Sequence, residues 1–70
     1  MTEQDNAVSR REMRKHLYFV GLIDSLDASD QECAAALRTI PNIDNIVVLQ
    51  NTVGNDGVWA ARQVLDGETP

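Results

Sequence analysis

The sequence predicts an all-α domain of three to four short helices around a long first helix. A serine followed three residues later by a glutamate is the pattern of a capping box, and it occurs at Ser9 and again at Ser29. Apolar residues then recur at spacings of three and four, as they do on the buried face of a helix. The 70 residues suffice for one domain, so these helices should share one core.

The first helix is expected to run from Arg10 to Asp27, with Ser9 as its cap and Val8 and Met13 as a hydrophobic staple. At about 100° per residue, its apolar side spans an arc of about 200°. An arc that wide predicts either the central core helix or a seam between two copies. The arc contains Met13, His16, Leu17, Phe19, Val20, Leu22, Ile23 and Leu26.

The second helix should begin after Ser29 and end before Pro41, because the residue before a proline is pushed out of the helical region. A connection of two or three residues makes it a neighbour of the first helix. Residues 1–8 and 67–70 are predicted to be polar tails, since they lack apolar periodicity. The buried face of the second helix is predicted to comprise Cys33, Ala36, Leu37 and Ile40.

Residues 43–66 fit two different structures. Apolar spacing favours a third helix that is capped by Asn42 and stopped at Gly54, followed by a fourth helix capped by Asp56. The β-branched run of residues 46–48 and the chain-breaking segment 54–57 instead fit a hairpin. Adjacent alanines in the second block favour the helices. We therefore prefer the helical interpretation and keep an α+β fold with a C-terminal hairpin as the alternative.

The charge of the chain is unevenly distributed. The formal net charge is −5, yet residues 1–16 contain four basic and three acidic side chains, whereas residues 17–70 contain two basic and eight acidic ones. An acidic body disfavours broad contact with a phosphate backbone and favours basic protein partners. The basic residues of the first segment are Arg10, Arg11, Arg14 and Lys15.

This basic cluster lies in the first two turns of the predicted helix, where positive charge opposes the helix dipole. It fits a solvated face, an acidic partner, a phosphate, or the acidic stretch 24–32 of a second, antiparallel copy. Tyr18 lies one turn after Arg14, and aromatic side chains beside arginine are typical of interface hot spots, although a surface tyrosine with a solvated hydroxyl is the simpler interpretation. Trp59 fits a core anchor or a partner contact. These residues form the predicted partner-binding set.

The sequence contains no pattern that indicates catalysis. His16 and Cys33 are the single histidine and the single cysteine, and they fall on different predicted helices, so a nucleophile and base pair is not expected. No group of residues has metal-ligand spacing, and no cofactor is predicted. Cys33 is expected to be a small buried hydrophobic residue that reacts slowly.

A chain of this size without a disulfide or a metal needs additional buried area, which predicts a homodimer. No apolar run reaches the length of a membrane span and the N-terminus does not have the pattern of a signal peptide, so a cytoplasmic location is expected. The predicted dimer interface consists of Phe19, Leu22, Ile23 and Leu26.

The segment from Gly21 to Asp27, with Asp24, Ser25 and Leu26 at its centre, resembles the Asp-Ser-Leu segment of acyl and peptidyl carrier proteins. That resemblance implies that Ser25 would carry a phosphopantetheine arm. The family has a helix and a long loop before its serine and an apolar helix after it. Here the predicted first helix runs through Ser25, and an acidic stretch follows.

The sequence therefore predicts a non-catalytic protein-interaction module, such as a regulator, inhibitor or adaptor. The alternative is a small DNA-binding regulator of helix-turn-helix type, in which the third helix would present Gln50, Asn51 and Thr52 to base edges. That helix contains no lysine or arginine, which disfavours contact with phosphates.

Overall fold

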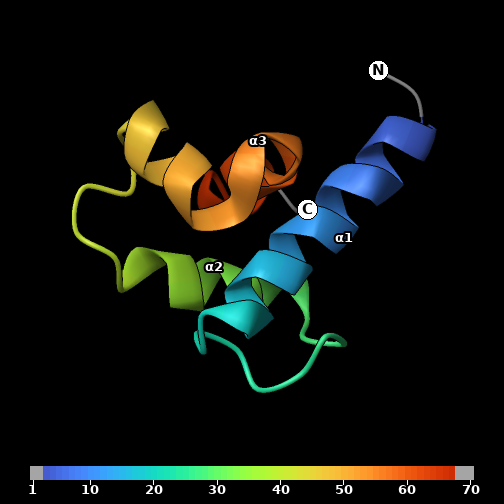
Figure 1. Cartoon of the computed structure of the whole chain (residues 1–70), viewed down its shortest axis with the longest axis horizontal. Coiled ribbons are helices and arrows are strands. Elements are labelled where there is room, and N and C mark those ends of the chain that lie inside the picture. Colours follow the sequence, from blue (N-terminus) through green and yellow to red (C-terminus); the bar gives the residue numbers. More distant parts are fainter. Residues whose placement is uncertain (1–2, 68–70) are drawn as a thin grey trace.

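The computed structural model describes the backbone of residues 3–67, with side chains from residue 7 onward. Within this range the chain forms three helices and no strand: α1 (Glu3–Phe19), α2 (Asp30–Arg38) and α3 (Ile46–Leu65) (Figure 1). The all-α prediction is confirmed. The alternative with a C-terminal hairpin is wrong, because the residues that it required as strands belong to α3.

The first helix differs from its prediction at both ends. It begins at Glu3, so the predicted polar tail is wrong for residues 3–8, and it ends at Phe19 rather than at Asp27. Residues 1–2 and 68–70, which were also predicted to be tails, lie outside the described residues. Ser9 is therefore inside the helix, and its predicted role as the N-cap is wrong. Its buried hydroxyl instead accepts a hydrogen bond of 2.8 Å from the backbone N–H of Ala60.

The end of α1 is set by Gly21. Its φ of +84° lies in the left-handed region that favours glycine. The N–H of Leu22 donates to the carbonyl of Leu17 at 2.9 Å, and the N–H of Gly21 donates to the carbonyl of Tyr18 at 3.1 Å. These two bonds form a Schellman motif, which satisfies the last carbonyls of a helix and turns the chain away. A loop over residues 20–29 follows.

The predicted start of α2 is confirmed. The N–H of Glu32 donates to Oγ of Ser29 at 3.1 Å, and the N–H of Ser29 donates to Oε1 of Glu32 at 3.0 Å, which completes the capping box. The helix ends at Arg38, before Pro41 as predicted. On the predicted apolar face, Cys33, Ala36 and Leu37 are buried and Ile40 is partly buried.

The third helix is capped by Asn45 rather than by Asn42, because Oδ1 of Asn45 accepts a hydrogen bond of 2.8 Å from the N–H of Val47. Asn42 itself has a φ of +61° and lies in the connecting turn. Gly54, with φ of +75° and ψ of +163°, interrupts α3, so the predicted stop at this residue is confirmed. Helical structure resumes directly afterwards, and the predicted cap at Asp56 is wrong for that reason.

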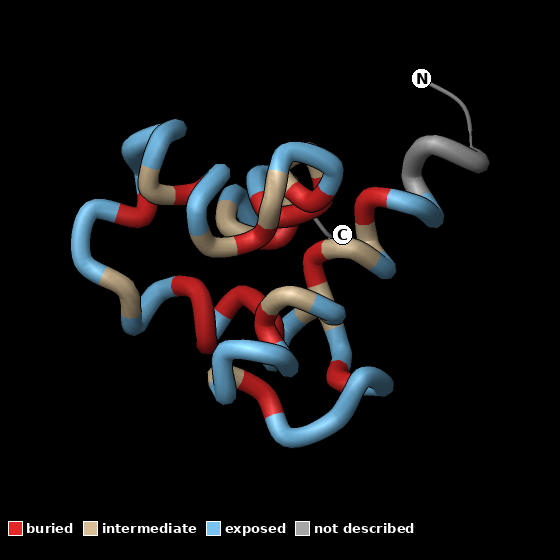
Figure 2. The backbone as a smooth tube through the Cα atoms, in the orientation of Figure 1, coloured by how far each residue is buried: buried red, intermediate tan, exposed pale blue. Residues whose placement is uncertain are grey.

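The core is aliphatic and lies mainly between α1 and α3, and α2 closes one side of it (Figure 2). The chain's three aromatic side chains all lie outside this core: Trp59 is half-buried, and Tyr18 and Phe19 are exposed. The largest side chains with no exposed area are those of Met13, Leu17, Leu37, Leu49, Val53 and Cys33.

Candidate functional site

The predicted basic cluster divides into two pairs with different surroundings. Arg10 Nη1 lies 3.3 Å from Oδ2 of Asp30, and Arg14 Nη2 lies 3.1 Å from Oδ1 of the same residue. Arg14 Nε also donates to the carbonyl of Ala28 at 2.9 Å. These two arginines therefore connect α1 to the start of α2. Asp30 belongs to the acidic stretch 24–32, which was one of the partners considered for this cluster across two copies, and it pairs with them within one chain.

The other pair, Arg11 and Lys15, points outward. Arg11 is exposed, and the side chain of Lys15 is 65% exposed, with its Nζ 3.7 Å from Oε2 of Glu12. The two residues are four apart on α1, so they lie on one face of the helix, one turn from each other. Tyr18 and Phe19 continue that face by one further turn. We call Arg11 and Lys15 the basic rim.

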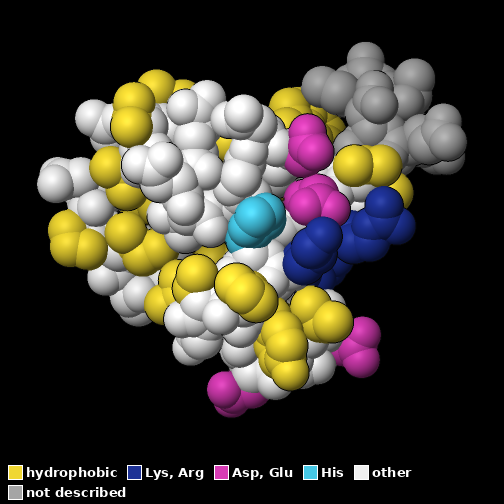
Figure 3. Space-filling model, in the orientation of Figure 1, with side chains coloured by type: hydrophobic (Ala, Val, Ile, Leu, Met, Phe, Trp, Pro, Cys, Tyr) yellow, Lys and Arg dark blue, Asp and Glu magenta, His cyan; other side chains and the backbone are white. Residues whose placement is uncertain are grey.

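Beyond the basic rim, α1 ends in a group of exposed apolar side chains, which we call the Phe19 patch: Tyr18, Phe19, Val20 and Leu26. Phe19 is 87% exposed, and the other three are each about half exposed. Figure 3 shows hydrophobic side chains gathered over the end of α1 and the loop that follows, beside the basic side chains of α1. Tyr18 and Phe19 are the last two residues of α1, and Val20 and Leu26 lie in the turn and loop that follow the Schellman motif.

This arrangement separates the four residues of the predicted dimer interface. The turn directs Leu22 and Ile23 back toward the core, where Ile23 is 8% exposed and Leu22 packs against the buried cluster. Phe19 and Leu26 remain on the surface. The prediction that all four form one stripe on one helix is wrong, because residues 20–27 are not helical. Val20 belongs to the patch and was not in the predicted site. It is exposed at the point where the chain turns away at Gly21.

The basic rim and the Phe19 patch meet at a surface hollow of about 370 Å³, which we call the Leu26 hollow. Arg11, Arg14, Lys15 and Leu26 line it. Its surface is mainly apolar, since long cationic side chains present their aliphatic stems and keep their charged ends in water. The geometry therefore places an apolar surface and two solvent-facing positive charges side by side.

The remaining predicted partner-contact residue, Trp59, lies on α3 and is half-buried. Ile46 and Val47, in the first turn of α3, are exposed apolar residues that the predicted site did not include. None of these α3 residues lines the Leu26 hollow.

The side chains with reactive chemistry do not come together. Cys33 is a free, buried thiol, and burial raises its pKa, while the nearby Arg14 guanidinium opposes that shift. His16 is half-buried, with its Nε2 3.7 Å from Oε1 of Glu12. In the described part of the chain, no three histidine, cysteine or carboxylate side chains are placed to hold a metal ion.

Ser25 differs in position from the serine of the carrier-protein family. It is exposed in the loop after α1, and its Oγ accepts a hydrogen bond of 3.0 Å from the N–H of Asp27. The next helix, α2, begins only at Asp30, whereas the family's helix begins at its serine. The resemblance is therefore limited to the short sequence segment.

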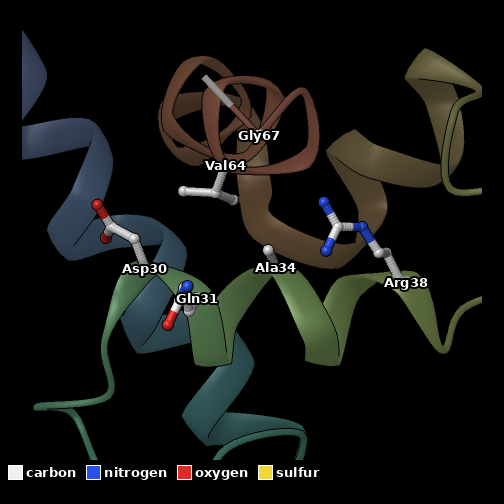
Figure 4. Close-up of a pocket in the computed structure, with 6 residues that line it drawn as sticks. All are labelled: Asp30, Gln31, Ala34, Arg38, Val64 and Gly67. Carbon is white, nitrogen blue, oxygen red and sulfur yellow. The ribbon is translucent and has the colours of Figure 1, made fainter. Parts of the chain in front are cut away.

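A second hollow, of about 260 Å³, lies between α2 and the end of α3 (Figure 4). Asp30 and Arg38 stand at opposite ends of it. Both charges have partners within the chain, because Asp30 pairs with two arginines and Arg38 Nη2 donates to the carbonyl of Leu65 at 3.1 Å. This hollow therefore offers less unpaired charge to a ligand than the Leu26 hollow does.

Comparison of the chain with protein families, curated proteins and solved structures finds no match in any of the three. None of the helices within residues 3–67 has the length and apolar character needed to cross a membrane.

Proposed function

We propose that this domain acts without catalysis by binding another protein through the Phe19 patch, as a regulator, inhibitor or adaptor. The observation that carries the proposal is the exposure of Phe19 at 87% in a domain whose core contains no aromatic side chain. Burying one such side chain in an interface contributes about 1.5–3 kcal/mol, and aromatic residues are enriched at interface centres. Phe19 thus contributes little to the stability of this chain and is available to a partner.

The neighbours of Phe19 support the same proposal. Tyr18, Val20 and Leu26 extend its apolar surface, and the basic rim borders it, so the region has an apolar centre and a charged edge. This is the usual organisation of a protein interface. Contiguous exposed apolar surface on a small soluble domain commonly marks such a site.

The DNA-binding alternative gains no such support. The connection between α2 and α3 covers residues 39–45, whereas helix-turn-helix motifs use turns of about three or four residues. The first turns of α3 expose Ile46, Val47, Gln50 and Asn51, with no cationic side chain. A phosphate backbone would meet apolar and amide groups there.

Self-association stays a prediction, but its electrostatic basis is weaker than the sequence indicated. A self-complementary interface needed the acidic stretch to meet the basic cluster of a second copy. Asp30 already pairs with Arg10 and Arg14 within one chain. The proposal therefore favours a different protein as the partner of the Phe19 patch.

Affinity capture from the native cell tests the proposal when it compares three baits: the wild-type chain, Phe19→Ser and Val47→Ser. Val47 is the matched control, since it is also an exposed apolar residue but lies on α3. We expect one or more proteins captured by the wild type and by Val47→Ser to be lost with Phe19→Ser.

The purified partner should then bind Phe19→Ser about 30-fold or more weakly than the wild type, which corresponds to a hot-spot contribution of about 2 kcal/mol. Both variants should retain the wild-type circular dichroism spectrum. Equal capture by all three baits would show that the Phe19 patch is not the binding surface.

A further inference from the structure

We infer that the Leu26 hollow receives an acidic amphipathic segment of the partner, with an apolar side chain against Leu26 and a carboxylate at the basic rim. This inference rests on the proposed function and names the chemistry of the partner. Its basis is charge complementarity at the hollow, together with the composition of the surface that lines it.

The charge argument starts from the whole chain, which carries a net charge of −5. An acidic ligand is therefore repelled by most of the molecule. Of the six cationic side chains, Arg10 and Arg14 are held against Asp30, and Arg38 donates to a backbone carbonyl. Arg62 is exposed on α3, outside the lining of the hollow. At the Leu26 hollow, Arg11 is exposed and Lys15 is only loosely paired with Glu12. An acidic segment thus meets attraction where these two side chains stand together.

The walls of the hollow add the apolar requirement. Leu26 and the stems of Arg11, Arg14 and Lys15 form the lining, so a purely ionic ligand would leave this apolar surface in water. The volume of about 370 Å³ is near the lower end of the range of about 300–1,000 Å³ that is typical of ligand pockets. A large apolar side chain is the group that such a surface accommodates best.

The spacing of the rim indicates how the two requirements combine. Arg11 and Lys15 are one helical turn apart, a separation of about 6 Å along the axis. A partner helix with acidic residues at a spacing of three or four presents carboxylates at the same separation, and its apolar face then turns toward Leu26 and Phe19. Such insertion of an amphipathic helix into an apolar surface is a recurring mode of recognition.

Selection from a displayed library of random peptides tests this inference without knowledge of the natural partner. The peptides should be about three helical turns long, roughly 11 residues, so that they can span the rim and the patch. The immobilised target is the full wild-type chain. We expect the enriched peptides to combine acidic residues with large apolar ones.

Each enriched peptide is then synthesised with a fluorescent label, and its affinity is measured by anisotropy. The double variant Arg11→Glu with Lys15→Glu should weaken binding by about tenfold or more. Arg62→Glu is the matched control, because Arg62 is exposed on α3 and outside the lining of the hollow, and it should change binding by less than about twofold. A peptide with its acidic residues changed to lysine should recover binding to the double variant.

Three results would overturn the inference. In the first, the enriched peptides require Phe19 but contain no acidic residues, or they bind equally well after Arg11 and Lys15 are changed to glutamate. The proposed function would then stand, and the inference of an acidic partner would be wrong. Displacement of the peptide by a short DNA duplex at equal concentration would indicate a nucleic acid instead. A library without any peptide that depends on Phe19 would count against the proposed function as well. Amide NMR spectra of the variants confirm that each remains folded.

Discussion

The two faces of α1 differ in burial. One face carries Met13 and Leu17, which have no exposed area, and Ser9, whose hydroxyl accepts a hydrogen bond from α3. The other carries Arg11, Lys15, Tyr18 and Phe19, which are exposed. Buried and exposed residues alternate along the same turns of α1, because a helix returns to each face every three or four residues.

This contrast teaches that the determinants of folding and the proposed determinants of binding can be changed separately. Side chains on the packed face hold α1 against α3, and their loss costs stability. Side chains on the open face contact little of their own chain, so their loss should leave the fold intact and alter only what the surface binds. The following substitutions test that separation, beginning with the largest expected effect.

Replacement of Met13 by alanine should cause the largest loss of stability. Met13 has no exposed area and lies between α1 and α3, so the change leaves a cavity and should lower the free energy of unfolding by about 2–5 kcal/mol. Urea denaturation followed by circular dichroism measures this, and Lys15→Ala on the open face is the control. A loss below about 1 kcal/mol would show that the core relaxes around the cavity.

Two of the three described glycines with positive φ, Gly21 and Gly54, sharpen the comparison. Gly54→Ala should cost about 1–3 kcal/mol from its conformation alone, because φ of +75° with ψ of +163° is a region essentially restricted to glycine. A Cβ there would also lie 2.8 Å from Nε2 of His16, whereas a Cβ at Gly21 would meet nothing within 4 Å.

We therefore expect Gly54→Ala to be more destabilising than Gly21→Ala in the same denaturation assay. Adding His16→Ala should recover the steric part of the loss at Gly54 and none of the loss at Gly21. Equal losses at the two glycines would mean that His16 moves aside without cost.

The thiol of Cys33 reports on the packed side of the molecule through its reactivity. Burial raises its pKa, so the native chain should react with a thiol reagent much more slowly than the chain in denaturant. A raised folded-state pKa contributes stability that is complete below the unfolded pKa of about 8.5 and is lost as the pH rises through the folded value. When the pH is raised above that value, the urea midpoint of denaturation should therefore decrease. The decrease should be larger in the wild type than in Cys33→Ala. Equal labelling rates in the two states would show an accessible thiol.

The two predicted capping boxes, of which the structure has the one at Ser29, show which parts of the fold can be predicted from sequence. At Ser29 the local pattern predicts the helix start correctly, because its two hydrogen bonds join residues three apart. At Ser9 the same pattern fails, because the hydroxyl bonds to Ala60, which lies 51 residues away. Local signals contain no information about such a partner, so the start of α1 could not be obtained from them.

In the candidate site too, local features could be predicted from the sequence and contacts between distant residues could not. The exposure of Arg11 and Lys15 agrees with a solvated face, which was one interpretation of the basic cluster, and the exposure of Tyr18 agrees with a surface tyrosine. Gly21 was the signal that the helix ends early, and extending the apolar periodicity through it placed Leu22 and Ile23 on a surface that they do not reach. The pairing of Arg10 and Arg14 with Asp30 depends on how α1 and α2 meet, which spacing along the chain does not specify.

The smallest effect on stability is expected for Phe19→Ser. An exposed residue of the open face contributes little to folding, so the free energy of unfolding should change by no more than about 0.5 kcal/mol. The same variant also tests the predicted homodimer, because Phe19 and Leu26 are the two residues of that predicted interface that remain on the surface. Sedimentation equilibrium of the wild type at micromolar concentration should give about twice the chain mass of 7.7 kDa if the patch covers a second copy.

Phe19→Ser should then give the monomer mass, and it should also lose the stability that the dimer contributed, a loss that increases with the logarithm of protein concentration. If the wild type is instead a folded monomer at every concentration, Phe19 has no partner of its own kind. That result would leave a different protein as the partner that we propose for it. A large and concentration-independent loss of stability in Phe19→Ser would break the comparison itself, because it would place Phe19 among the residues that hold the fold together.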